Sequence, residues 1–343
     1  MAEPVFRDSN LQQQFDADGY VFLNHFLSKE EVEQLKQAYF DLLPESGGAM
    51  SGDETDFKSE SEITYDFTFI DRNWEYKQKV FDVIQAAFEA HYEPILADYT
   101  PIIANFIRKG EDGGEVPLHQ NWAFADEIKY STVSIWVPLV DSTRINGTLE
   151  ITPGSHKRFG QFRGPVIPWE CEKIKEDIIR DYMVPMDAEA GDCVILDDSV
   201  VHYSNINRTA GLRLTIQLIL IPKATRSIHY HLDRAQNPDE VRILEVDRDF
   251  YMKFHPWKRP EGKEIGKQKV ELRYIDLAEW KERLEGPEFG DANYADFMRD
   301  LRAAQVAAVK VQIPESAVAV QATTQVASTN EAGFFSRIKK LFS

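Results

Sequence analysis

The pattern of apolar and polar positions divides the chain into a helical first part and a strand-rich middle. Apolar residues recur at helical spacing in two segments, which predicts one helix starting at Ser28 and a second over roughly 74–92. The first helix begins with SKEE, in which a serine three residues before Glu31 is typical of a capping box. YVFLNHF at 20–26 predicts a short strand, and the polar stretch 46–64 predicts a loop.

From about residue 100 to 222 the pattern changes to short β-rich runs separated by Gly, Pro, Asp or Asn. The runs are PIIANFIR, STVSIWVPL, GTLEITPG, GDCVILDD and LRLTIQLILIP. Because no helical pattern separates them, they favour an antiparallel barrel or sandwich over a parallel α/β sheet. We therefore predict a mainly β core with flanking helices.

The C-terminal part predicts an extension followed by a tail. Residues 223–305 are rich in charged and aromatic residues, with helices expected near 276–285 and 292–305, and they fit either an ordered extension of the core or a separate subdomain. We take 1–305 as a single domain and 306–343 as a flexible tail, because 306–330 lacks aromatic residues. The end, GFFSRIKKLFS, could form a short basic amphipathic helix that docks on a partner or a membrane surface, with folding back onto the domain and disorder as alternatives.

Composition narrows the class of protein. The chain has 343 residues, 43% of them hydrophobic, which is enough for a substantial core. Its formal charge of −18 repels polyanions, so neither a nucleic-acid groove nor binding to an anionic membrane is expected. No secretory signal or transmembrane run is recognisable, which predicts a cytoplasmic location. The two cysteines, Cys171 and Cys193, are expected to be buried free thiols.

Candidate chemistry lies at the edges of the β-rich runs. HQNWAF at 119–124 places His119 and Asn121 two residues apart, which would put them on one face of a strand. His202 ends GDCVILDDSVVH, and Arg213 opens an otherwise apolar strand, where an unpaired charge is costly. Arg213 therefore needs an anionic partner, either a structural carboxylate or a ligand carboxylate held by two hydrogen bonds.

In their order and spacing these motifs resemble the phytanoyl-CoA dioxygenase family of Fe(II)- and 2-oxoglutarate-dependent oxygenases. The resemblance covers roughly residues 11–222, from FDADGYVFLNHFLSKEEVEQL through HQNW, SIWVPL, NGTLEITPGSHK and GDCVILDDSVVHYSNINRT to GLRLTIQL. It implies a double-stranded β-helix, a cupin-like jelly-roll, as the core at about 100–222. It also implies Fe(II) as cofactor, 2-oxoglutarate as cosubstrate, and O₂-dependent hydroxylation or oxidation of a C–H bond in a small organic molecule.

The resemblance also assigns roles to individual residues. His119 and His202 correspond to the family's iron-binding histidines, and Arg213 corresponds to the arginine that binds the far carboxylate of 2-oxoglutarate. Thr215 could add a hydroxyl to that carboxylate. The family aspartate falls at Asn121, so the iron would have two imidazoles and, at best, one neutral amide oxygen. We take His119, Asn121 and His202 as the metal-binding and catalytic residues.

Further residues are expected around this site. Ser134 and Trp136 share a strand face and are expected beside the cosubstrate, while Trp122 and Phe124 could line the cavity or belong to the core. Substrate contacts are expected from the 46–70 loop and from the segment that follows the barrel.

Asn121 leaves several alternatives open. Asp126, Asp197 or Asp198 could replace it as a ligand, or water or an anion could take its position. Halogenation would need chloride at that position, which an asparagine side chain should obstruct. The protein could also be a catalytically impaired family member that binds 2-oxoglutarate or another metabolite, with both histidines in a metal-free relic of the site.

Overall fold

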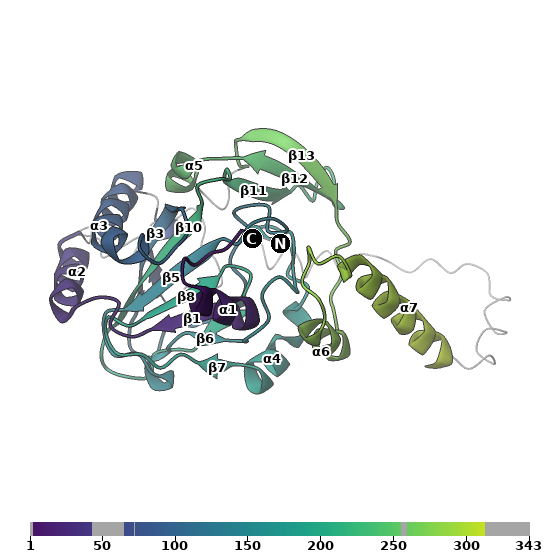
Figure 1. Ribbon diagram of the computed structural model, residues 1–343, viewed down its shortest axis with the longest axis horizontal. Coiled ribbons are helices and arrows are strands. Elements are labelled where there is room, and N and C mark those ends of the chain that lie inside the picture. Colours follow the sequence, from purple (N-terminus) through teal and green to yellow (C-terminus); the bar gives the residue numbers. More distant parts are fainter. Residues whose placement is uncertain (1–2, 43–64, 72, 255–258, 313–343) are drawn as a thin grey trace, which may run out of the picture. The chain divides into compact units, whose positions relative to one another are not determined.

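The computed structural model describes residues 3–42, 65–71, 73–254 and 259–312 (Figure 1). The described residues fall into two units. The first ends at Asp291 and contains every described strand, and the second contains helix α7 (Tyr294–Gln312). Within the described residues, no helix combines the length and apolar character needed to cross a membrane.

A six-stranded antiparallel sheet forms the centre of the first unit. Its strand order is β1 (Tyr20–Leu23), β8 (Cys193–Asp197), β5 (Val133–Pro138), β10 (Arg213–Pro222), β3 (Tyr99–Lys109) and β2 (Tyr65–Phe67). A four-stranded antiparallel sheet consists of β4 (Val116–His119), β9 (His202–Ser204), β6 (Glu150–Ile151) and β7 (Val184–Pro185). The longest pairing joins β10 to β3 and places Arg213 directly opposite Lys109.

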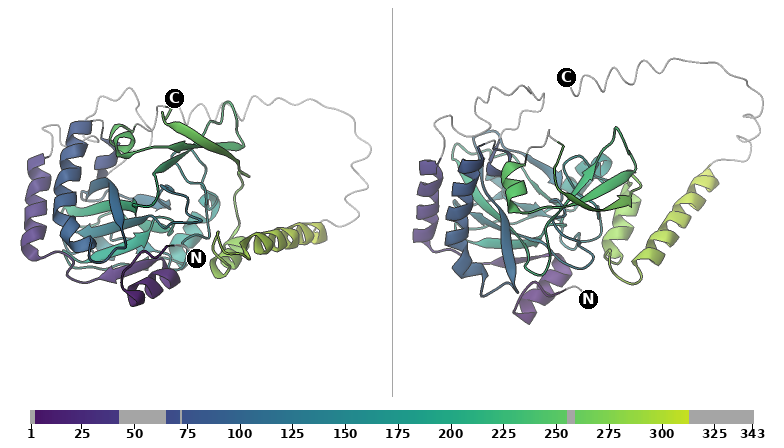
Figure 2. Two further views of the ribbon diagram at one scale, coloured as in Figure 1. Left: turned by 45° about the horizontal axis from the view of Figure 1, so that its top comes forward. Right: turned by 90° about the horizontal axis from the view of Figure 1, so that it is seen from above.

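Alternation along the central strands separates an apolar face from a polar one. One face of β10 carries Leu214, Ile216, Leu218 and Leu220, all in the main hydrophobic cluster. Helices α2 (Lys29–Leu42) and α3 (Trp74–Tyr92) lie side by side over this face and contribute Leu35, Ile84 and Phe88 to the cluster (Figures 1 and 2). The opposite face carries Arg213, Thr215 and Gln217. Because strand side chains alternate, the apolar packing on the helices fixes which residues face the second sheet.

A third, three-stranded sheet forms the start of the C-terminal extension. It consists of β11 (Ile228–Leu232), β12 (Glu240–Glu245) and β13 (Lys263–Lys269), and it lies beside one end of the six-stranded sheet (Figures 1 and 2). Ile228 and Tyr230 pack with Ala123 in one apolar cluster, and the Ile228 amide donates to the Phe124 carbonyl oxygen at 2.9 Å. The remaining helices of this unit are α1 (Ser9–Asp18), α4 (Lys175–Asp181), α5 (Arg248–Lys253) and α6 (Leu277–Glu285).

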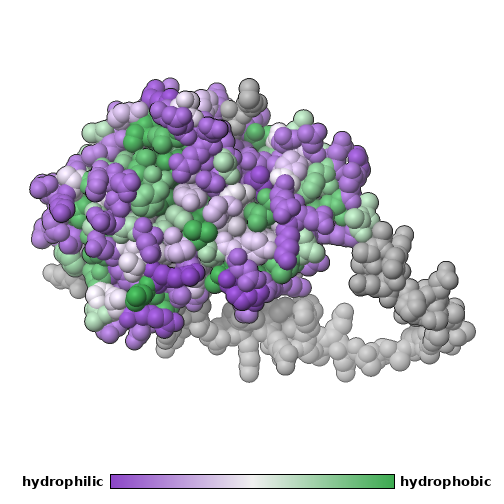
Figure 3. Space-filling view, turned by 60° about the horizontal axis from the view of Figure 1, so that its bottom comes forward, coloured by the Kyte–Doolittle hydropathy of each residue, from purple (hydrophilic) through white to green (hydrophobic). Residues whose placement is uncertain are grey.

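The predicted mainly β architecture with antiparallel sheets and flanking helices is confirmed. The helices expected from Ser28 and over 74–92 are α2 and α3, and Ser28 forms the expected capping box with Glu31. Both cysteines are buried and free, as predicted. Hydrophilic residues cover most of the face seen in Figure 3, in keeping with the high charge.

Other expectations are corrected or lie outside the described residues. The residue pattern did not predict α1 or the third sheet, and the contacts of that sheet favour an extension of the core over a separate subdomain. Helix α7 continues to Gln312, through the boundary expected at residue 305. Residues 313–343, with the expected amphipathic end, and the loop residues 43–64 lie outside the described part of the chain.

Candidate metal and cosubstrate site

Two histidines meet between neighbouring strands of the four-stranded sheet. His119, the last residue of β4, pairs directly with His202, the first residue of β9, and their ring centres are 4.2 Å apart. The Nδ1 atom of His119 lies 2.7 Å from the Pro117 carbonyl oxygen, and that of His202 lies 2.8 Å from the Val200 carbonyl oxygen. Each Nδ1 must therefore carry the proton, which leaves each Nε2 with a free lone pair.

Burial favours the neutral state of both rings. Desolvation lowers the pKa of His119, although hydrogen bonds to Pro117 and Asn121 oppose this effect. Burial, together with the neighbouring His119, lowers the pKa of His202 well below its usual value. Neutral imidazoles with exposed Nε2 lone pairs are the form that binds transition metals.

Asn121 lies beside the histidines with its amide nitrogen turned away from them. Nδ2 donates to Asp198 Oδ1 at 2.8 Å and to Ser134 Oγ at 3.0 Å. Since both amide protons are used there and Nδ1 of His119 is bonded to Pro117, the amide oxygen is the group of Asn121 left to face Nε2 of His119. This contact is a hydrogen bond only when Nε2 is protonated; in the neutral ring two lone pairs meet there. The donor set on this side of the cavity is two imidazole nitrogens and one amide oxygen.

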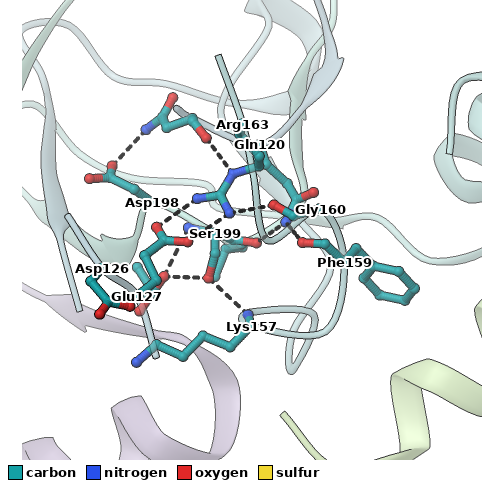
Figure 4. Close-up of polar contacts among 12 residues, drawn as sticks. Gln120, Asp126, Glu127, Lys157, Phe159, Gly160, Arg163, Asp198 and Ser199 are labelled. Carbon is teal, nitrogen blue, oxygen red and sulfur yellow. Dashed lines mark hydrogen bonds and ion pairs between the residues drawn. The ribbon is translucent and has the colours of Figure 1, made fainter. Parts of the chain in front are cut away.

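A buried polar network holds the backbone of this segment (Figure 4). The strand ends at His119, so the expectation that HQNWAF enters a strand is wrong, and residues 120–124 have irregular backbone. The Nε atom of Arg163 donates to the Asn121 carbonyl oxygen at 2.6 Å, while its two terminal nitrogens each lie 2.7 Å from a Glu127 oxygen. Gln120 donates to the Phe159 and Ser199 carbonyl oxygens. These side-chain bonds fix the backbone at Asn121, as backbone hydrogen bonds would in a strand.

Two buried basic side chains lie together at the other side of the cavity. Arg213 is only 2% exposed, and Lys109, its direct partner across the sheet, is fully buried. Both approach one hydroxyl group, because Lys109 Nζ and Arg213 Nη2 each donate to Ser204 Oγ. Lys109 also donates to the Asn205 carbonyl oxygen at 2.7 Å. Within the described residues, neither cation forms an ion pair, and Arg213 Nε has no hydrogen-bond partner.

The pKa values of both cations reflect this unbalanced charge. Burial lowers the pKa of Arg213 to about 9. Burial and, next, the charge of Arg213 lower the pKa of Lys109 to about 6, and more distant acids offset only part of this. A buried, uncompensated arginine is unfavourable unless an anion joins it.

The cavity between these groups holds about 100 Å³ and lies between the two larger sheets. His119, Asn121 and His202 face it from one side, and Arg213 and Gln217 face it from the other. Its remaining walls are mostly apolar and come from Phe67, Ile107, Val116, Trp136, Leu149, Leu196, Tyr203 and Ser204. The site therefore combines an edge of two imidazoles and one amide, a basic end and an apolar lining.

The other residues expected here fall into two groups. Trp136 lines the cavity, and the Arg213 guanidinium carbon lies 5.6 Å from the centre of its ring. Ser134 lies behind Asn121, and Thr215 accepts a hydrogen bond from Arg213 at 3.3 Å; neither is part of the cavity wall. Phe124 belongs to a buried core cluster against which Trp122 packs.

Asp126, Asp197 and Asp198 do not take the position of a metal ligand. Asp126 forms an ion pair with Lys129 at 2.8 Å, and Asp197 accepts bonds from the backbone and hydroxyl of Ser199. Asp198 contacts Asn121 from behind. Accordingly, the described residues contain no group of three His, Cys, Asp or Glu side chains arranged to hold a metal.

The chain is similar to known proteins over most of this fold. The family model described as "Phytanoyl-CoA dioxygenase (PhyH)" matches residues 15–215. This chain belongs to the phytanoyl-CoA dioxygenase family. The recognition made from the motifs is therefore confirmed, and so, at the level of the family, is the expected class of 2-oxoglutarate-dependent non-haem iron dioxygenases that use Fe(II) and 2-oxoglutarate.

Individual relatives of the family differ in how much of each chain is matched. A phytanoyl-CoA dioxygenase domain-containing protein 1 homolog of Dictyostelium discoideum is 31% identical, and the match covers 49% of this chain and 60% of that protein. Phytanoyl-CoA dioxygenase 1 of Oryza sativa subsp. japonica is 25% identical over 60% of this chain and 86% of its own. This chain thus spans less than two thirds of the Dictyostelium protein.

Two solved structures are also similar to parts of this chain. EctD from S. alaskensis, in a crystal structure with 2-oxoglutarate and 5-hydroxyectoine, is 21% identical with a TM-score of 0.49, and the match covers 78% of this chain and 87% of EctD. The non-heme alpha ketoglutarate dependent carbocyclase SnoK from nogalamycin biosynthesis is 17% identical with a TM-score of 0.48, over 66% of this chain and 89% of SnoK.

Lys109, Gln217 and Ser204 were missed by the motif search, although two of them carry a signal in the sequence. Ser204 is two residues after His202, and Gln217 is four residues after Arg213, so each shares a strand face with a recognised residue. Lys109 ends NFIRK, and only the pairing of β3 with β10 brings it opposite Arg213.

Proposed function

We propose that this protein is an Fe(II)- and 2-oxoglutarate-dependent dioxygenase that hydroxylates, or otherwise oxidises, a C–H bond of a small organic molecule. The observation that carries the proposal is Arg213, a buried guanidinium with no anionic partner among the described residues, at the end of a cavity whose other side presents His119 and His202. A ligand carboxylate would supply the missing negative charge, and the histidines would bind the metal.

The residues present fit a ferrous ion bound with a dianionic cosubstrate. His119 and His202 offer Nε2 lone pairs, and Asn121 offers its amide oxygen, which is a weaker donor than the carboxylate usual in such sites. When bound, Fe(II) supplies the activation of O₂ that no protein side chain can provide. The protein's own side chains bind and orient the reactants. Arg213 attracts the carboxylate, and Trp136 and Leu196 limit the entry of water.

The fold supports this assignment. We propose that the six-stranded and four-stranded sheets are the two halves of a double-stranded β-helix, the cupin-like jelly-roll expected from the family resemblance, because both sheets are antiparallel and the cavity lies between them. A cytoplasmic location remains part of the same proposal, alongside O₂ and a small-molecule substrate as the reaction partners.

The substrate would approach along the aromatic side of the cavity. Phe67, from the end of the loop expected to contact substrate, lines the cavity. Its neighbour Phe69 packs on Trp122 at 5.4 Å and stacks on Phe254 of the C-terminal extension at 5.4 Å. The two segments expected to provide substrate contacts thus meet over the residue that follows Asn121, which supports an apolar wall at the substrate side.

A second candidate function rests on Asn121. Without a carboxylate at this position, the site would hold iron more weakly, and the protein could act as a 2-oxoglutarate or metabolite binding protein that does not turn over. Halogenation is less compatible with the geometry, since the Asn121 side chain is held by Asp198 and Ser134 and fills the place that chloride would need.

Anaerobic titration of the purified protein with Fe(II) and 2-oxoglutarate tests the proposed function. We expect a visible metal-to-ligand charge-transfer band that appears only when both are present and that is lost in Arg213→Met. The absence of a band at millimolar 2-oxoglutarate would contradict the dioxygenase assignment, because the cosubstrate would not reach the metal.

Succinate release in air separates the two candidates. We expect the natural protein to convert 2-oxoglutarate to succinate at a rate above that of Arg213→Met. If Asn121→Asp releases succinate and the natural protein does not, the binding function is favoured. The asparagine at position 121 would then be the reason why the natural protein does not turn over.

A further inference from the structure

A buried carboxylate lies directly behind the amide that replaces the family's ligand aspartate. Asp198 Oδ1 accepts hydrogen bonds from Asn121 Nδ2 at 2.8 Å and from Ser134 Oγ at 2.6 Å. Gln217 Nε2 in turn donates to Ser134 Oγ at 3.3 Å. Asp198 and Ser134 are both fully buried, so these bonds are protected from competition with water.

This arrangement determines which end of the amide faces the metal position. An asparagine side chain can turn by half a rotation, which would present the nitrogen, a group that does not bind metal cations. The ionised carboxylate of Asp198 accepts hydrogen bonds and donates none, and Ser134 already donates to the same Oδ1. The amide nitrogen therefore points toward Asp198, and the amide oxygen is left on the opposite side. The bond therefore selects the ligating orientation.

In the part of the chain that the structure describes, Asp198 has no direct cationic partner that would explain its burial. Within the described residues it forms no ion pair, and the guanidinium of Arg163 in the same network is engaged by Glu127 (Figure 4). A buried carboxylate held by neutral donors is unfavourable in the free protein, and burial accordingly raises the pKa of Asp198 to about 7, although hydrogen bonds from Ser134 and Asn121 oppose this effect. A divalent cation on the far side of Asn121 would offset that cost.

We propose that Asp198 is a positioning residue that holds the Asn121 oxygen toward the metal. Through its hydrogen bond to the Asn121 amide, it also supplies the negative charge that a carboxylate ligand would carry. The inference rests on the proposed function. Groups that hydrogen-bond to metal ligands orient them and strengthen binding, and their loss typically weakens metal affinity 10–100-fold. The family carries the negative charge on the ligand at position 121, whereas in this protein the charge is on Asp198 and acts through the Asn121 amide.

Binding of Co(II) to the metal-free full-length protein tests this inference without turnover. The dissociation constant and the visible Co(II) spectrum would be measured for the natural protein, Asp198→Asn and the control Asp197→Asn. Asp197 is equally buried but bonds to Ser199 rather than Asn121. We expect Asp198→Asn to bind Co(II) roughly 10–100-fold more weakly with an altered spectrum, and Asp197→Asn to keep both properties while losing a similar amount of thermal stability.

An exchange of the two side chains provides the rescue. In Asn121→Asp/Asp198→Asn the amide lies behind and can donate to the carboxylate, so Co(II) affinity should return to the natural level or exceed it. Should Asp198→Asn not fold, Ser134→Ala removes one of the two bonds to the same carboxylate and should weaken Co(II) binding in the same direction.

The outcomes distinguish failure of this inference from failure of the proposed function. Equal Co(II) affinity in the natural protein and Asp198→Asn, or equal losses in Asp198→Asn and Asp197→Asn, would overturn the role of Asp198 alone. A natural protein that binds no Co(II) at millimolar concentration would overturn both, because Asn121 would then have no metal to face.

Discussion

Arg213 and Lys109 are the residues whose placement is hardest to explain without a ligand. They face each other directly across β10 and β3, and both are buried. Two like charges in this position would destabilise the sheet, and burial and the charge of Arg213 lower the pKa of Lys109 to about 6, which favours its neutral form at pH 7. The bonds to Ser204 satisfy some of their donors but supply no negative charge. The ligand-free protein is therefore less stable than it would be with a dianion bound, because the dianion would compensate the buried positive charge.

Replacing Arg213 tests this interpretation at the level of one residue. In Arg213→Met we expect the dissociation constant for 2-oxoglutarate to rise about 100-fold or more, because two hydrogen bonds to a charged group contribute about 1.5–3 kcal/mol each. The ligand-free variant should be as stable as the natural protein or more stable, since a buried cation is replaced by an apolar group. Calorimetric titration and thermal unfolding measure the two quantities.

The exposed Arg208 provides a matched control for Arg213. Arg208→Met removes the same charge from the surface and should leave 2-oxoglutarate affinity within about 3-fold, since exposed charges contribute little. A marked loss of stability in Arg213→Met without ligand would show that the arginine has a structural partner and would contradict its role as an anion site.

Lys109 predicts a distinct dependence of stability on pH. Its pKa falls from 10.5 to about 6 on folding, mainly through burial, so below pH 6 both states carry the proton and the cost of burying the charge is complete. Between these pKa values the unfolded chain binds a proton that the folded chain lacks, so stability increases with pH. Relative to Lys109→Met, the free energy of unfolding of the natural protein should rise between pH 6 and 9 by at most about 1.4 kcal/mol per pH unit.

Urea unfolding of the metal-free proteins at three pH values in this range measures that difference. Parallel curves for the natural protein and Lys109→Met would mean that Lys109 keeps its proton throughout, and the neutral buried amine would be rejected.

At the scale of elements, a local capping motif determines where helix α2 begins, and packing against α3 and the sheet determines its position. Ser28 Oγ accepts from the Glu31 amide at 3.2 Å, and Glu31 Oε2 accepts from the Ser28 amide at 2.7 Å. The other oxygen of Glu31 lies 2.8 Å from His91 Nε2 on α3. The capping box therefore also joins the two helices that cover the sheet.

Removing the cap should have a measurable cost. We expect Ser28→Ala to lower the free energy of unfolding by about 1 kcal/mol, the typical value for loss of a capping hydroxyl. Ser28→Asp should retain most of the stability, because a carboxylate also caps and favours the helix N-terminus. Chemical unfolding of all three proteins measures this, and an equal loss in both variants would show that capping is not the cause.

The central strands could be predicted because each has two different faces. In β10, apolar residues at alternate positions pack on α2 and α3, which leaves Arg213, Thr215 and Gln217 on the opposite face. The same alternation places Trp136 of β5 at the cavity. By contrast, β6 and β7 have only two residues each and give no periodic signal, and 120–124 is held by side-chain bonds from Arg163 and Gln120.

At the scale of the whole molecule, site residues that stand in a sequence motif could be predicted. Residues that only the topology brings to the site could not. His119, His202 and Arg213 stand in recognisable motifs, and the structure brings them to one cavity. Lys109 reaches the site through strand pairing. Asp198 was considered from the sequence only as a ligand, and its bond to Asn121, 77 positions earlier, depends on contact between distant segments. No local spacing rule describes such contacts, so their roles emerged only from the fold.

The last prediction concerns the total charge. An excess of acids, 57 Asp and Glu against 39 Lys and Arg, produces self-repulsion that salt screens, whereas exposed ion pairs contribute little that salt could remove. Raising NaCl from 0.01 to 0.3 M should therefore raise the melting temperature of the metal-free protein by roughly 2 °C or more, equivalent to about 1 kcal/mol. Chloride could also bind beside Arg213, so the same series in Arg213→Met separates the two effects: screening persists in the variant, and specific binding does not. A melting temperature that falls with NaCl in both proteins would show instead that ion pairs dominate the electrostatic stability of the molecule.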